Sequence, residues 1–197
     1  MENQSVKRPE LKPLKITCTS SDCERSLHCF KKSRKMVEAD RGKCRACGAN
    51  LIDWKRVHKR DVKDAQYTFD ALKMELFRHH FWHEEIDEKA IRHAKRKGRK
   101  GLIESARNRL IKKVAVTNNR YDGLQTPFEG NIIFYAQHAL ACCCRKCIEY
   151  WHGIPVNKEM DENQIEYFVD MIMMYIENRM PDLTENGEYV PRITIYH

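Results

Sequence analysis

The residues best suited to chemistry in this sequence are its nine cysteines, which fall into two groups. Five lie between positions 18 and 47, and four lie between positions 142 and 147. Two cysteines separated by two residues can present both thiolates to one zinc ion, because the turn between them is tight. The first group contains one such pair, which predicts a zinc knuckle of the zinc-finger kind. We expect its ligands to be Cys18, Cys23, Cys44 and Cys47, with His28 and Cys29 as nearby substitutes.

The second group mixes cysteines with histidines and offers six candidate ligands, of which one zinc ion takes about four. It repeats the two-residue spacing at Cys144 and Cys147. The first histidine precedes Cys142 by one helical turn, and the second follows the last cysteine at a spacing that zinc fingers tolerate. We expect the ligands to be His138, Cys144, Cys147 and His152, with Cys142 as the substitute.

The expected cellular compartment supports metal binding over disulfides. The N-terminus has no apolar signal core, and no apolar run approaches the roughly 20 residues of a membrane helix. We therefore expect a cytoplasmic protein, in which cysteines stay reduced. The prediction is one or two zinc ions. In the single-zinc alternative, the two cysteine pairs close one four-thiolate site from Cys44, Cys47, Cys144 and Cys147.

Two sets of residues are candidates for catalysis. His58 follows the first cysteine pair at the spacing of HNH-type nucleases, and Asp61 lies three residues later. In the second set, a histidine pair spaced to share one face of a helix precedes a carboxylate that could act as a base. Either set would use Mg²⁺ or Mn²⁺, although packing or capping is the simpler role for the histidines. The second set is His79, His83 and Glu84.

The net charge of +8 conceals two strongly basic blocks. Residues 7–60 hold 16 basic and 6 acidic side chains, and residues 89–113 hold 11 and 1, so each block carries +10. Residues 159–188 hold 1 basic and 9 acidic side chains. Dense basic blocks attract nucleic-acid phosphates, while an acidic protein is the competing partner. The expected phosphate contacts are Lys55, Arg56, Lys59, Arg60, Lys95, Arg96, Lys97, Arg99 and Lys100.

Apolar residues at three- and four-residue steps predict helices over 62–82, 86–97 and 102–114. Gly98 lies where a helix would end. A fourth helix is expected between Asp161, which with Gln164 forms a capping-box pattern, and Pro181. Residues 117–131 predict a loop, 132–136 a short strand or a buried helix, and 192–196 a short strand.

The predicted fold is mostly α, of the α+β class, with about four helices stapled by one or two Cys/His zinc sites. Residues 16–60 are poor in apolar side chains, and such a segment needs a metal to hold it. We expect a flexible arm over 1–15, a zinc-knuckle module over 16–60, a helical domain with the second Cys/His group over 61–180, and a tail over 181–197.

The second Cys/His group also carries a family resemblance. Residues 136–147 read Ala-Gln-His-Ala-Leu-Ala-Cys-Cys-Cys-Arg-Lys-Cys, and residues 151–155 read Trp-His-Gly-Ile-Pro. This pattern resembles a small bacterial family known only as a domain of unknown function, whose members have Thr in place of Leu140. The resemblance is specific over about 122–180 and extends over most of 40–190. It implies one folded unit that includes both cysteine groups, and it implies no activity.

Together these patterns predict a zinc-binding protein that contacts nucleic acid through basic patches, within a bacterial or phage complex of the defence type. The alternatives are a metal-dependent, HNH-like nuclease and a zinc-stapled adaptor between proteins. The sequence contains no phosphate-binding glycine loop, nucleophile elbow or dinucleotide fingerprint, so kinases, serine hydrolases and dehydrogenases are poor candidates.

Overall fold

The computed structural model describes residues 16–33, 35–117, 123 and 125–191. In this part the protein is mostly helical, as predicted, with seven α-helices and no strand. The expected strand at 192–196 lies outside the described residues. The helices are α1 (Trp54–Val57), α2 (Ala65–Lys73), α3 (Leu76–His83), α4 (Glu88–Arg109), α5 (Ile132–Ala139), α6 (Arg145–His152) and α7 (Glu162–Arg179).

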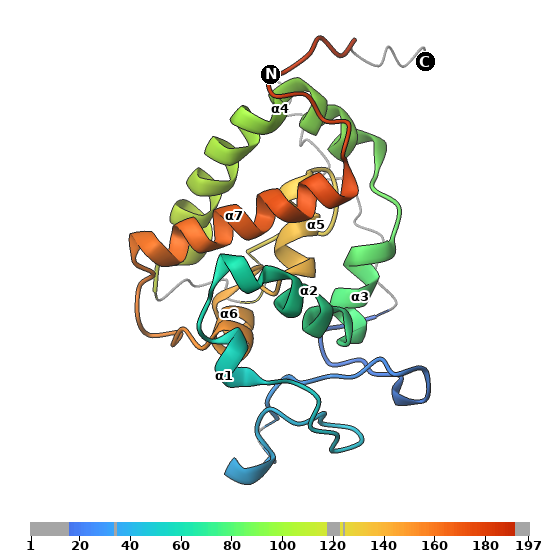
Figure 1. The fold of residues 1–197 in the computed structure, drawn as a ribbon, viewed down its shortest axis with the longest axis vertical. Coiled ribbons are helices and arrows are strands. Elements are labelled where there is room, and N and C mark those ends of the chain that lie inside the picture. Colours follow the sequence, from blue (N-terminus) through green and yellow to red (C-terminus); the bar gives the residue numbers. More distant parts are fainter. Residues whose placement is uncertain (1–15, 34, 118–122, 124, 192–197) are drawn as a thin grey trace, which may run out of the picture.

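The core lies where α7 crosses α4 and α5 and where α3 packs on α5 (Figure 1). The buried face of α4 consists largely of small residues, Ala90, Ala94 and Ala106, which allow a neighbouring helix to approach closely. Larger buried side chains come from α5 and α7, such as Ile133 and Phe168, and also from α3 and α6, such as Phe81 and Trp151. Within the described residues, no helix is long and apolar enough to span a membrane.

Side-chain caps begin α4, α5 and α7, the last at the predicted residue Asp161. Asp161 begins α7 with a capping box. Its side chain accepts from the Gln164 N–H at 2.9 Å, and the Gln164 side chain accepts from the Asp161 N–H at 3.2 Å. Asp87 caps α4 through its side chain, which accepts from the Ala90 N–H at 2.9 Å. Residues 132–136, for which strand and buried helix were both open, lie in α5, and Asn131 caps that helix.

The prediction of one continuous helix over 62–82 is wrong. The chain forms two helices there, α2 and α3, and is not helical between them. Glu75 takes extended φ and ψ angles of −90° and 122°. Its backbone neighbours pair with the N-terminal segment: the His28 N–H donates to Met74 O at 2.7 Å, and the Leu76 N–H donates to His28 O at 2.9 Å. The apolar spacing continues across the break, but the two helices point differently.

Helix α4 breaks at Gly98, which has φ 62° and ψ 175°, so the chain leaves the helix where the sequence predicts an end. Residues 181–188, which we call the C-terminal strap, cross α4 at this break. The N–H groups of Arg99 and Lys100, released from the helix, donate to Thr184 O at 2.9 Å and Glu185 O at 3.1 Å. A Cβ atom on Gly98 would lie 2.4 Å from the carbonyl carbon of Asn186. The break therefore supplies the binding site for the strap.

Candidate metal centres

The first candidate centre gathers three thiols and one imidazole. The ligand atoms of its members all lie within 4.8 Å of one another. The sulfurs of Cys23 and Cys44 are 3.7 Å apart, and Cys47 Sγ lies 3.5 Å from His28 Nδ1. The arrangement can hold a metal ion. We call this group the first cluster: Cys23, His28, Cys44 and Cys47.

The knuckle itself is a tight turn. The Gly48 N–H donates to Cys44 O at 2.8 Å, and the Cys44 N–H donates to Ala49 O at 2.8 Å. Gly48 has φ 75°, in the left-handed region that favours glycine. This turn places both thiols on one side, as the spacing predicts.

The first cluster differs from the predicted ligand set by one residue, since His28 occupies the place expected for Cys18. His28 is held by the paired backbone at Met74 and Leu76, which fixes its ring beside the knuckle. Cys18 lies elsewhere, with its sulfur 2.9 Å from Lys31 Nζ. The spacing of the cysteines gives no information about the backbone pairing of His28 with residues 46 and 48 positions further along the chain.

The thiols of the first cluster differ in acidity. Burial acts to raise the pKa of Cys44, but backbone N–H groups of Cys29, Cys47 and Ala46 outweigh it and lower this pKa to about 6. Burial and the neighbouring Cys47 and Cys44 thiols raise the pKa of Cys23 to about 12. One thiol is thus prepared as a thiolate, and a divalent cation would offset the repulsion that holds the second one protonated.

The second candidate centre lies at the N-terminus of α6. The sulfurs of Cys143, Cys144 and Cys147 lie within 4.8 Å of one another, and all three residues are buried. We call this group the second cluster. The two cysteine pairs of the sequence therefore lie in separate groups, contrary to the alternative in which Cys44 and Cys47 share one zinc with Cys144 and Cys147.

Three residues predicted as ligands near the second cluster lie outside it. Both ring nitrogens of His152 have partners, Leu140 O at 2.8 Å and the Tyr167 hydroxyl at 3.5 Å. His138 Nε2 lies 3.2 Å from Thr126 O. Burial lowers the pKa of both histidines to about 3, so both rings are neutral. Cys142 is fully buried and is not in the cluster, while its neighbour Cys143 is.

A buried ion pair lies next to the second cluster. The Arg78 guanidinium donates to Cys147 Sγ at 3.1 Å and lies 3.8 Å from Cys143 Sγ. It also pairs with the Glu75 carboxylate, which in turn accepts from the Phe30 N–H at 3.2 Å. Arg78, which sequence reasoning missed, is the charged group closest to these thiols. The one sequence signal for this role is that Arg78 falls on the apolar, buried face of its helix.

The five predicted catalytic residues lie in two places. His58 follows α1, and its Nε2 is buried without a hydrogen-bond partner in the described part of the chain, while Asp61 caps the turn before α2 through the Lys63 N–H. On α3, His79 and His83 stack at 4.0 Å, and each directs Nδ1 toward a backbone carbonyl oxygen, as capping residues do. Glu84 lies 2.7 Å from His80 Nε2.

The family comparison covers the region of the second cluster. A family model described as a domain of unknown function, DUF4186, matches residues 66–177. The chain belongs to this family. The DUF4186 match runs from α2 to α7 and contains the second cluster, whereas all four members of the first cluster precede it. No solved structure matches the chain significantly.

In the basic block that precedes the DUF4186 match, two of the residues expected to contact phosphate instead contact other parts of the protein. Arg56 forms an ion pair with Asp64 at 2.5 Å, and Arg60 donates to His152 O at 2.7 Å. Lys55 and Lys59 are exposed, with no carboxylate within 4.0 Å among the described residues. They leave positive charge on the surface beside the first cluster.

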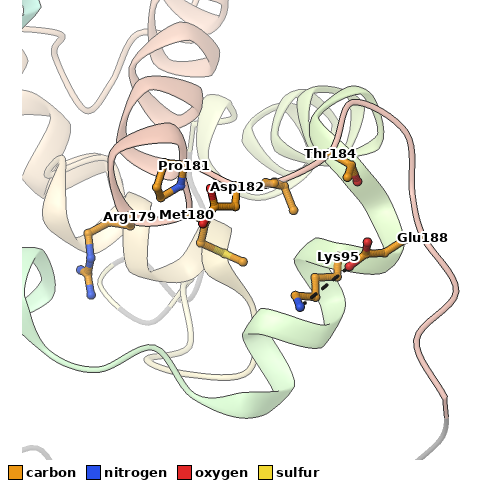
Figure 2. Close-up of a pocket in the computed structure, with 8 residues that line it drawn as sticks. Lys95, Arg179, Met180, Pro181, Asp182, Thr184 and Glu188 are labelled. Carbon is orange, nitrogen blue, oxygen red and sulfur yellow. Dashed lines mark ion pairs between the residues drawn. The ribbon is translucent and has the colours of Figure 1, made fainter.

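In the second basic block, the C-terminal strap contacts three of the five residues on α4 expected to contact phosphate, including Lys95 (Figure 2). Lys95 pairs with Glu188 at 3.9 Å, and Figure 2 shows this ion pair beside the pocket that the strap forms with α4. Arg99 donates to Leu183 O and Glu177 at 2.9 Å, and Lys100 lies 3.4 Å from the Asn186 side chain. The described structure assigns no ion pair to the two exposed cations that remain, Arg96 and Lys97.

Proposed function

We propose that the first cluster binds zinc and that the metal stabilises the fold rather than performing catalysis. The observation that carries this proposal is the closed set of four protein ligands, three thiols and one imidazole. Thiolate and imidazole ligands suit zinc, and a site with four protein ligands leaves no position for a reacting water. Catalytic zinc sites keep such a position open.

Metal analysis of the full-length protein tests this proposal. Cys47→Ser should reduce the zinc content by about one ion per chain, because it removes one of the four ligands. Ala46→Ser, in the same turn but without a ligand atom, is the matched control and should retain all the zinc. Purified protein free of zinc, or a Cys47→Ser variant with unchanged zinc, would overturn the proposal.

We also propose that the surface beside the first cluster contacts nucleic acid. Four exposed cations there lack an ion pair in the described structure: Lys32, Arg45, Lys55 and Lys59. Lys32 lines a pocket of about 280 Å³ with Trp54 and His58. Cations that neutralise phosphates next to an aromatic side chain are typical of proteins that bind single strands. Hydrolysis is not part of this proposal, since Asp61, His79 and His83 are each engaged with backbone groups. Membership of a defence-type complex remains a prediction.

A salt titration with labelled single-stranded and duplex DNA and RNA tests this contact. Affinity should fall steeply with salt, and the Lys55→Ala, Lys59→Ala double variant should lower the logarithmic slope by about 2. The Arg96→Ala, Lys97→Ala double variant makes the same charge change beside the strap and should alter the slope less. Absence of binding at low salt would reject nucleic acid and leave an acidic protein as the partner to test.

A further inference from the structure

The second cluster contains three thiols, whereas a structural zinc site has four ligands. Its three cysteines line a pocket of about 330 Å³. Two other residues with ligand atoms line the same pocket, Cys18 and His138. Neither belongs to the group of atoms within 4.8 Å, so one of them must move to complete a tetrahedron.

Cys18 and one ammonium group line the same pocket as the cluster. Lys31 Nζ lies 2.9 Å from Cys18 Sγ, and Lys31 lines the pocket together with Cys18 and the three cluster cysteines. Thiols from two distant parts of the sequence therefore share one pocket and one nearby cation. Cys18 is only half-buried and begins a short turn, closed by the Ser20 N–H donating to Thr17 O at 2.9 Å. Because Cys18 lines the same pocket, a movement of this turn could bring its sulfur to the cluster.

His138 has less freedom to move. Its ring is stacked between Phe81 and Phe128, with centroids 4.6 Å and 4.8 Å away. Its Nε2 faces the carbonyl oxygens of Thr126 and Pro127 at 3.2 Å. Its Nδ1 is buried without a hydrogen-bond partner in the described structure, which makes His138 the competing candidate. Directing this atom at the metal would require breaking the stack or moving α5.

We propose that Cys18 is the fourth ligand of a second zinc site, with Cys143, Cys144 and Cys147. The metal then joins the N-terminal segment directly to α6, across a separation of more than 120 residues in the sequence. This proposal goes beyond the zinc at the first cluster, which holds only residues 23–47 together.

The charges around the pocket fit four thiolates. A zinc ion with four thiolates carries a net charge of about −2, which is costly to bury without nearby cations. Lys31 contacts Cys18, and Arg78 contacts Cys147 and Cys143. These two cations approach different sulfurs, and each can donate N–H groups to a thiolate once the metal is bound. Donors of this kind orient and stabilise metal ligands.

Zinc content in a Cys47→Ser background isolates the second site. The Cys47→Ser protein should hold about one zinc, and adding Cys18→Ser should remove it, while adding Thr19→Ser, in the same turn, should not. Adding His138→Asn should leave the zinc in place. Retention of zinc without Cys18, or its loss with His138→Asn but not with Cys18→Ser, would overturn the proposal.

Alkylation of the wild-type protein gives a second measurement that does not depend on a variant that folds. Cys18 is half-exposed, so iodoacetamide should modify it rapidly after zinc is chelated and slowly when zinc is bound. Fast modification of Cys18 in a protein that holds two zinc ions would overturn the proposal. Wild type with one zinc, lost on Cys47→Ser, would reject this second site and leave the zinc proposed at the first cluster intact.

Discussion

Glu75 and Arg78 form an ion pair at 3.0 Å in which neither side chain has any exposure to solvent. The carboxylate also accepts from the hydroxyl of Tyr150 at 2.9 Å and from the indole N–H of Trp151 at 2.8 Å. Phe30 adds a backbone N–H from the N-terminal segment. One carboxylate thus connects α3, α6 and the chain that carries the first cluster.

We predict that Glu75→Gln destabilises the protein by about 3–5 kcal/mol, because it removes the charged partner with which Arg78 forms its buried ion pair. Urea unfolding, compared with wild type at the same zinc loading, measures this change. Arg25→Ala breaks an exposed pair with Asp22 and should cost less than about 1 kcal/mol. A Glu75→Gln cost as small as that of Arg25→Ala would contradict the account given for this pair.

Chelation of zinc should loosen the N-terminal segment before the helices. Residues 16–50 contribute few large buried side chains, so their order depends on the two clusters and on the pairing at Met74 and Leu76. Hydrogen exchange should accelerate at amides such as those of Cys44 and Gly48, while amides in the middle of α7 keep their protection. Uniform acceleration across the chain would show that the clusters stabilise the whole fold cooperatively.

Gly98→Ala should destabilise the protein by about 1–3 kcal/mol, because a side chain at φ 62° is strained and its Cβ would collide with the Asn186 backbone at 2.4 Å. Gly101→Ala in the same helix is the matched control. Its Cβ would meet only the flexible Lys97 side chain at 3.3 Å, so we expect a neutral or stabilising change of up to about 1 kcal/mol. Thermal unfolding of both variants decides between these outcomes.

Glu84 should make stability depend on pH between about 4.5 and 7. Burial raises the pKa of its carboxyl to about 7, with Arg179 opposing the shift and Asp87 and Glu129 adding to it. The folded state therefore binds more protons than the unfolded state in this window, so stability falls as the pH rises through it.

Glu84→Gln should remove this contribution, and its advantage over wild type should grow to about 1–3 kcal/mol above pH 7. Unfolding curves for the two proteins at a series of pH values provide the test. An advantage that is the same at pH 5 and pH 8 would contradict the raised pKa.

Local sequence patterns were sufficient for the features that depend on neighbours along the chain. The capping box at Asp161, the end of a helix at Gly98 and the turn at Cys44 to Cys47 each involve residues within a few positions of one another. Their geometry follows from backbone preferences, which distant contacts reinforce here.

The features that the sequence could not supply depend on long-range contacts. The break at Glu75 forms because partners near positions 30 and 150 surround its carboxylate. His28, rather than Cys18, completes the first cluster because the same break pairs its backbone. Cys143 rather than Cys142 belongs to the second cluster, and adjacency in the sequence does not indicate which of two cysteines faces the other ligands.

The C-terminal strap and the Glu75 contacts also bear on where the folding unit begins and ends. A fragment limited to the DUF4186 match, residues 66–177, would lose Phe30 and His28 at one end and Thr184 and Glu185 at the other. It would keep Arg78 beside the second cluster but expose the released N–H groups of α4 at Gly98. The contacts that hold the family-matched span thus extend beyond it, to the segment that carries the first cluster at one end and to the strap at the other.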